Sequence, residues 1–150
     1  MLEVEKKHHH HGELIREIAH TVVLDYDQRS KGRLKAVTTT GQAIGLFLER
    51  GKVLRNGDIL ETKDGELVLV QSAQESLIEG SCDDWLVFSK CCYHLGNRHV
   101  PIQIDELSLR MRPDYILEEM MQQLGLTTKT VEAGFDPEQG AYAGGHHHHH

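Results

Sequence analysis

Residues 93–104 read YHLGNRHVPIQI, and this stretch joins a predicted helix to a predicted strand. Upstream, apolar side chains recur at helical spacing, and Gly96 is expected to end the helix in a left-handed conformation. The apolar positions are Trp85, Phe88, Cys92 and Leu95. Downstream, Pro101 cannot continue a helix, and the apolar residues around it alternate as in a half-buried strand. The stretch therefore predicts that His99 lies at an exposed junction, held firmly by its two neighbours.

The second half of the chain alternates strands and helices in the order βαββαβ. The predicted strands span 75–80, 100–104, 107–111 and 128–133, and the predicted helices span 84–95 and 113–124. Pro113 is a favoured first-turn residue of the second helix, and Gly125 is expected to end it. Asp105-Glu106 is expected to close a tight hairpin between the two central strands. This order predicts an α+β domain with the ferredoxin-like split βαβ topology.

The first half of the chain predicts a small all-β domain. Its β-like segments are short, and turn sequences such as Asn56-Gly57-Asp58 separate them. The candidate strands span 15–24, 33–37, 43–48, 58–60 and 67–70. The sequence thus predicts two small domains, at 1–73 and 74–135, followed by a flexible histidine-containing tail at 136–150.

Composition excludes several classes of function. The formal net charge is −7 and no basic stripe is visible, so a nucleic-acid surface has little electrostatic support. No apolar run is long enough to cross a bilayer, and the N-terminus lacks the pattern of a signal peptide, so we expect a cytoplasmic protein. The three cysteines are few, and Cys91-Cys92 point about 100° apart on a helix, which favours reduced thiols.

Histidines are the candidate metal ligands. A single imidazole at His99 is far short of a tetrahedral or square site, and a surface histidine is the simpler interpretation. Histidine-rich tracts at both ends of the chain favour metal handling instead. One tract occupies residues 8–11, and the other follows a Gly-Gly pair and comprises His146, His147, His148, His149 and His150. The terminal tract is typical both of a purification tag and of a native metal-binding tail, whereas the internal position of residues 8–11 favours a native segment.

Several motifs spread over residues 13–142 carry a family resemblance. They are RGKVL at 50–54 with NGD at 56–58, YHLGNRHVP at 93–101, LEEM at 117–120 with LGL at 124–126, FDPE at 135–138 and GAY at 140–142. In combination they resemble the urease accessory protein UreE family of nickel metallochaperones. The resemblance implies a peptide-binding-like β domain and a ferredoxin-like domain that forms a homodimer. It also implies a nickel ion held across the two-fold axis by the histidine matching His99, and delivery of nickel to apo-urease together with an accessory GTPase.

The implied cargo is Ni(II), and Cu(II) and Zn(II) are its expected competitors because copper binds such ligands at least as tightly. Two symmetry-related imidazoles leave open positions that a tail histidine fills and vacates on its flexible linker. Family members often place further histidines at the start of the second helix of this domain, where this chain reads Arg112-Pro113-Asp114-Tyr115. His94 lies one helical turn from Cys91, which suggests either a second soft site or an ordinary helix histidine.

Three classes of function follow from these observations. The first is a nickel carrier without catalysis, and the alternative is a peptide-binding co-chaperone or scaffold with incidental metal binding. An enzyme using Cys91 or Cys92 with His94 or His99 has no identifiable general base with an orienting partner. Met120 and Met121 are predicted to be core residues rather than metal ligands, because they lie at helical spacing. His20 is predicted to be structural or exposed.

Overall fold

A computed structural model describes residues 1–8, 16–49 and 51–140. The chain divides into two compact units, an N-terminal unit of Met1–Ala73 and a C-terminal unit that begins at Gln74 and is described to Gly140. The predicted fold class is confirmed, because a sheet-built unit precedes a unit with βαββαβ order. Each unit is described by itself below.

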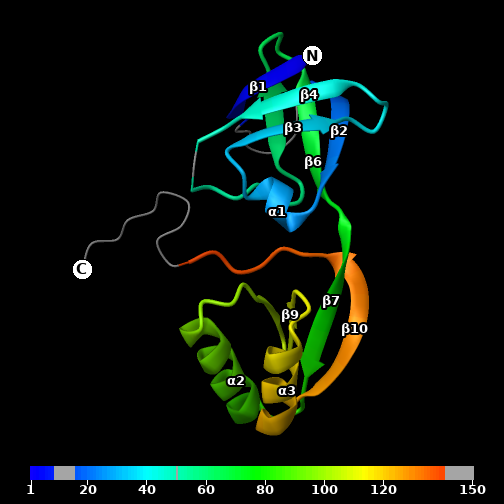
Figure 1. Ribbon diagram of the computed structural model, residues 1–150. Helices are drawn as coiled ribbons and strands as arrows, with labels where there is room; N and C mark the ends of the chain where they lie inside the picture. The colour runs from blue at the N-terminus through cyan, green and yellow to red at the C-terminus, as the bar shows by residue number, and fades with distance from the viewer. Residues whose placement is uncertain (9–15, 50, 141–150) are drawn as a thin grey trace, which may run out of the picture. The chain divides into compact units, whose positions relative to one another are not determined.

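The N-terminal unit is built on a six-stranded sheet with the order β2-β6-β5-β1-β4-β3 (Figure 1). Its strands are β1 (Leu2–Lys7), β2 (Ile18–Leu24), β3 (Arg33–Val37), β4 (Ala43–Phe47), β5 (Ile59–Thr62) and β6 (Leu67–Ser72). The pairs β1/β4 and β2/β6 are parallel, and the other pairs are antiparallel. Alternate side chains of the strands form one apolar core, which includes Val4, Val22, Ile44, Leu46, Leu60 and Val70.

Two elements of this unit were not predicted. Strand β1 reads LEVEKK, and only Leu2 and Val4 are buried, so the charged positions conceal its pattern. The one-turn helix α1 (Tyr26–Arg29) begins with a capping box formed by Asp25 and Gln28. The helix places Arg29 in the interior, where its guanidinium donates hydrogen bonds to two backbone carbonyl groups.

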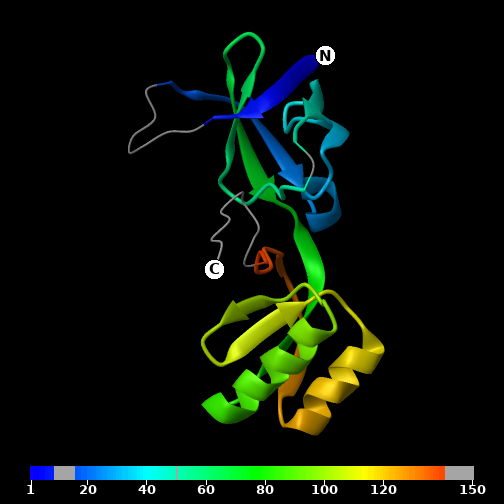
Figure 2. The same ribbon diagram turned by 90° about the vertical axis from the view of Figure 1, so that its left-hand side faces the viewer.

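The C-terminal unit has an antiparallel sheet with the order β10-β7-β9-β8. Its elements are β7 (Gln74–Ser81), α2 (Trp85–Asn97), β8 (Gln103–Asp105), β9 (Ser108–Met111), α3 (Tyr115–Leu124) and β10 (Thr127–Gly134). The two helices lie side by side against the sheet (Figure 2), as in a ferredoxin-like fold. Met121 is buried and Met120 packs against the same core, which confirms their structural assignment. Within the described residues, no helix has both the length and the apolar character that a bilayer span requires.

The buried face of α2 differs from the predicted one. Phe88, Cys91 and Leu95 are buried, whereas Trp85 is 57% exposed and Cys92 is only partly buried. The buried positions are three and four residues apart, so they form one stripe along the helix. The predicted stripe was therefore wrong at its first and third positions.

The ends of the elements around residues 96–115 also differ from the prediction. Gly96 remains helical and α2 continues to Asn97, so the predicted left-handed end at Gly96 was wrong. Strand β8 begins only at Gln103, because residue 100 still bonds back to the helix. The hairpin loop lies one residue later than predicted, since Asp105 pairs with Ser108.

Helix α3 begins later than predicted and ends where expected. Its first residue is Tyr115 rather than Pro113, and the Asp114 side chain caps it by accepting a hydrogen bond from the Leu117 backbone N–H at 3.0 Å. Gly125 has a φ of 112° and ends the helix in the left-handed region, as predicted.

A pair of glycine substitutions tests these two helix ends. Replacing Gly125 by alanine puts a Cβ atom into a left-handed residue, 3.2 Å from Val87 Cγ1, and should lower the free energy of unfolding by about 1–2 kcal/mol. Gly96→Ala meets no atom within 4 Å and should raise stability by about 0.5–1 kcal/mol. Trp85 is the only tryptophan, so urea unfolding followed by its fluorescence reports this unit. Effects of equal sign would contradict the assignment of the helix ends.

Candidate metal-binding site

The end of helix α2 sets the position of His99. The N–H of His99 donates to the carbonyl of Gly96 at 3.0 Å, and the N–H of Val100 donates to the carbonyl of Leu95 at 3.2 Å. These two bonds form a Schellman-type helix end, in which the residue after the C-cap takes a left-handed conformation. His99 is that residue, with a φ of 59°.

A histidine at this position carries a backbone cost. Glycine usually occupies it, although histidine tolerates the left-handed region better than most residues do. Leu95 is fully buried, and Val100 packs against the same core, so the hydrophobic contact that accompanies this motif anchors the turn. The exposed imidazole is therefore presented to solvent from a rigid backbone.

A shallow groove of about 520 Å³ opens beside His99. The segment that follows α2, the residues just before α3 and the first turn of α3 contribute to it. Its lining comprises Arg98, His99, Val100, Pro101, Arg112, Pro113, Asp114 and Leu117. We call this feature the His99 groove.

Asp114 is the acidic residue in the lining of the His99 groove. Its Oδ1 atom caps α3, and its exposed carboxylate adds an oxygen donor beside the imidazole. The sequence analysis, which considered histidines as ligands, did not predict Asp114. Asp114 follows His99 by 15 positions, and only the fold brings both residues to one groove. Arg98 and Arg112 in the same lining oppose the approach of a cation to a single chain.

The other predicted ligands do not join His99 within the described residues. His94 is exposed on α2, where its ring lies edge-on to Tyr93 with 5.4 Å between centroids, and it does not line the His99 groove. Cys91, the partner proposed for His94 in a soft site, is fully buried. The terminal histidines lie outside the described residues, as does most of the tract at residues 8–11.

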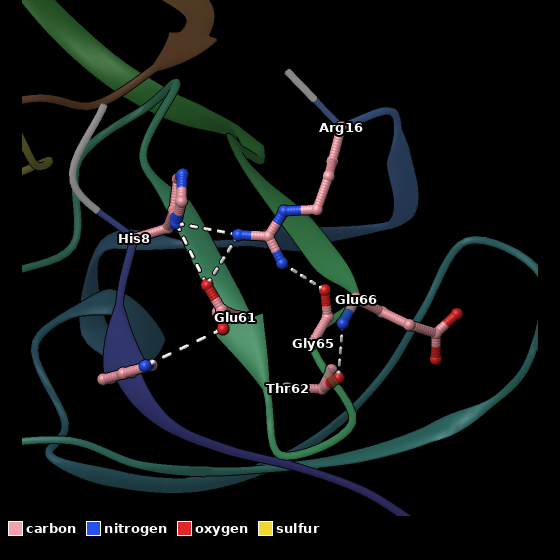
Figure 3. Close-up of polar contacts among 7 residues, drawn as sticks. His8, Arg16, Glu61, Thr62, Gly65 and Glu66 are labelled. Atoms are coloured by element: carbon pink, nitrogen blue, oxygen red, sulfur yellow. Dashed lines mark hydrogen bonds and ion pairs between the residues drawn. The ribbon is translucent and has the colours of Figure 1, made fainter. Parts of the chain in front are cut away.

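His8 is the described member of the N-terminal tract, and Figure 3 shows its surroundings. Its Nδ1 atom lies 3.0 Å from Glu61 Oε1, and Arg16 Nη2 donates to the same oxygen at 2.9 Å. Arg16 Nη1 donates to the carbonyl of Gly65 at 2.6 Å. The hydrogen bond from Arg16, followed by that from His8, holds the pKa of Glu61 below its usual range. His8 is thus engaged with a carboxylate that already has a fixed cationic partner.

His20 in β2 is partly buried, in line with a structural position. Its Nε2 atom lies 3.3 Å from a carboxylate oxygen of Glu66.

Cys91 and Cys92 are unsuited to metal or nucleophilic chemistry. Burial raises the pKa of the Cys91 thiol to about 11, and the neighbouring thiols of Cys92 and Cys82 add to the shift. Burial also raises the pKa of Cys92. A thiolate is the reactive and metal-binding form of cysteine, so both residues are held in their inert form.

The described residues of one chain supply too few ligands for a closed metal site. The described residues contain no group of three or more His, Cys, Asp or Glu side chains that is arranged to hold a metal ion. The His99 groove offers one imidazole and one carboxylate, both at the surface. Such a half-site fits an ion that is shared with a second set of ligands.

Comparison with known proteins assigns both halves of the chain. The family described as UreE urease accessory protein, N-terminal domain, matches residues 3–73, and its C-terminal domain matches residues 75–150. The urease accessory protein UreE of Marinomonas sp. (strain MWYL1) is 50% identical over 126 residues, which cover 84% of this chain and 86% of the relative. The protein of the same description from Aliivibrio fischeri (strain MJ11) is 43% identical over 150 residues, with 95% and 92% covered.

A third relative, urease accessory protein UreE of Azotobacter vinelandii, is 50% identical over 128 residues, with 85% of this chain and 77% of the relative covered. Two matching domain patterns and long alignments at this identity lead to one assignment. The chain belongs to the UreE family of urease accessory proteins.

Proposed function

We propose that this protein is a nickel-binding metallochaperone that delivers Ni(II) to apo-urease during assembly of the urease active site. The observation that carries the proposal is His99, an exposed imidazole held in a left-handed helix end beside an open groove. A strained backbone position occupied by a potential ligand favours a functional role for that residue. Membership of the UreE family supplies the urease context.

The nickel site requires a homodimer in this proposal. A two-fold axis beside the His99 groove brings two imidazoles, and two Asp114 carboxylates, to a single ion. Tyr115 and Ile116 at the start of α3 are 81% and 70% exposed and follow the groove residue Asp114 directly. Large exposed apolar side chains beside a half-site support an interface with a second copy at this place.

The terminal histidines act in this proposal as exchangeable ligands. The backbone N–H of Asp136 donates to Gln103 Oε1 at 2.9 Å, and the N–H of Glu138 donates to the carbonyl of Ile102 at 2.7 Å. These bonds hold the chain near the His99 groove before the tail begins. His146 follows Glu138 by only eight positions in the sequence. A tail histidine therefore reaches the site at high effective concentration and leaves it again.

Selectivity for nickel arises outside the site itself. Imidazole and carboxylate ligands bind copper at least as well as nickel, and they also bind zinc. Supply of the metal in the cytoplasm, and docking to apo-urease and its accessory GTPase, would then decide which ion is delivered. A peptide-binding scaffold with incidental metal binding is the alternative, and nickel binding by His99 separates the two.

The first prediction concerns His99 and uses a chain without the competing histidine tracts. In this tract-replaced protein, residues 9–11 and 146–150 are serine, which leaves His8, His20, His94 and His99. His99→Asn removes the imidazole and retains a residue that tolerates a positive φ, so nickel affinity should fall at least about tenfold while stability changes by less than about 1 kcal/mol. His94→Asn is the matched control and should leave nickel affinity unchanged. Calorimetric titration with nickel measures both.

The pH dependence gives a second readout for the same proteins. An imidazole binds a metal only when its ring nitrogen is unprotonated, so nickel affinity should fall steeply as the solution is made acidic. Competition with a chromogenic chelator follows this fall. The His99 site would be contradicted if the parent and the His99→Asn variant bound nickel equally, or if nickel affinity were unchanged at about pH 5. Carboxylates would then be the nickel ligands, or the scaffold function would be favoured.

The second prediction concerns the possibility, considered from the sequence, that the protein is an enzyme with Cys91 or Cys92 as its nucleophile. With the pKa of Cys91 raised from 9.0 to about 11, iodoacetamide at pH 8 should modify this thiol roughly 100-fold more slowly than a free cysteine. The raised pKa stabilises the fold at lower pH, and that contribution is lost as the pH rises from 9.0 toward about 11. Mass spectrometry of digests identifies the modified residue, and guanidinium-unfolded protein is the control. Rapid modification of Cys91 in the folded chain would restore a nucleophilic role.

A further inference from the structure

The first histidine of the internal tract, His8, is fixed on the sheet of the N-terminal unit. Its backbone N–H donates to the carbonyl of Ile59 at 2.7 Å. This bond continues the antiparallel pairing of β1 with β5 beyond Lys7. Residues 9–11 are also histidine and lie outside the described residues. The tract therefore begins at a residue whose position the sheet determines.

Glu61 determines which ring nitrogen of His8 carries the lone pair. The Nδ1 atom of His8 lies 3.0 Å from Glu61 Oε1. An ionised carboxylate only accepts hydrogen bonds, so this contact requires a proton on Nδ1 and leaves the lone pair of the neutral ring on Nε2. Arg16 Nη2 lies 3.4 Å from Nδ1, but its shorter contact, at 2.9 Å, is with Glu61. The shorter contacts therefore favour the ring with its proton on Nδ1.

A carboxylate bonded to the second ring nitrogen is the usual arrangement of a histidine that binds a metal. The carboxylate fixes the tautomer and the orientation of the ring, and it makes the other nitrogen more basic. His8 has this arrangement, and its side chain is 22% exposed. His20 also lies near a carboxylate, that of Glu66, but through Nε2 and with a side chain only 12% exposed. His8 thus combines an orienting carboxylate with access to solvent.

Arg16 holds the orienting carboxylate in place, as Figure 3 shows. Its two terminal nitrogens donate to Glu61 Oε1 at 2.9 Å and to the carbonyl of Gly65 at 2.6 Å. His8 and Arg16 flank residues 9–15, so the two ends of the segment that contains the tract meet at Glu61. The histidines that follow His8 directly in the sequence therefore have a high effective concentration at an ion bound to it.

We propose that His8 is the fixed ligand of a second metal site, which lies in the N-terminal unit and binds Ni(II), Cu(II) or Zn(II) through Nε2. Glu61 is the positioning residue, and the histidines at residues 9–11 supply further ligands. Imidazole nitrogen suits these three ions. All of these groups belong to one chain, so the site needs no second copy, whereas the proposed His99 site is shared. Binding at His8 does not depend on nickel binding by His99.

Nickel titration of a full-length variant isolates this site. In the reference protein, residues 146–150 are serine and His99 is replaced by asparagine, which leaves residues 8–11 as the histidine tract. Calorimetry should show one nickel ion per chain. His8→Ala should lower nickel affinity at least about tenfold, because it removes the oriented ligand. His11→Ala removes one imidazole from the same tract and should lower nickel affinity less than about threefold.

Matched carboxylate variants test the role of Glu61. Glu61→Gln keeps the size of the side chain and removes its charge, so nickel affinity should fall about tenfold to 100-fold. Glu66→Gln changes the net charge equally, at the turn after β5, and should leave nickel affinity unchanged. In the His8→Ala background, Glu61→Gln should have no further effect, because the ring that it orients is absent. Circular dichroism checks the fold of every variant.

Nuclear magnetic resonance of the histidine rings identifies the atom that binds the metal. Zn(II) is the diamagnetic probe, and its addition should shift the His8 Nε2 resonance while Nδ1 keeps its proton. This measurement on the reference protein decides the outcome if the Glu61→Gln variant does not fold.

Several results would overturn the assignment. Equal losses for His8→Ala and His11→Ala would show that the tract binds nickel without a fixed ligand. Equal losses for Glu61→Gln and Glu66→Gln would indicate a general charge effect. Coordination of zinc by Nδ1, or one nickel ion per two chains, would exclude the site in one chain. Because His99 is absent from every variant, none of these results bears on the shared site.

Discussion

The hydrogen bond from the Val100 N–H to the Leu95 carbonyl is the constraint on which the candidate site depends. It closes the end of α2 and requires a left-handed residue between the helix and the following loop, and that residue is His99. Leu95 is buried in the core of the C-terminal unit, so the direction of the imidazole is tied to the packing of the domain. The fold carries the backbone cost at His99, so the backbone of this candidate ligand is ordered before any ion arrives.

An incomplete donor set agrees with the task of a carrier. A closed site of four rigid ligands would retain its ion, whereas the His99 groove presents one imidazole and one carboxylate at the surface. The two arginines of the groove oppose binding of a cation to a single chain, and in the proposed site further donors come from a second copy and from the terminal histidines.

The sequence predicted the order of the elements well, because strong periodicity and turn residues mark them. Gly125 was correctly predicted as a helix end because glycine is the usual left-handed residue. The same rule placed the end of α2 wrongly at Gly96, three residues before His99, which is the true left-handed residue. Strand β1 escaped detection because its charged residues conceal two buried ones. His99 was identified from its junction and from a family resemblance, whereas Asp114 required tertiary structure, since residues distant in sequence share the groove.

The central claim is that one nickel ion is shared by two copies of His99. Its most direct test is the number of nickel ions per chain, measured by equilibrium dialysis and metal analysis, with the mass of the same sample from light scattering. The tract-replaced protein should bind one nickel ion per two chains, as a dimer. One nickel ion bound by each chain of a monomeric protein would contradict the shared site.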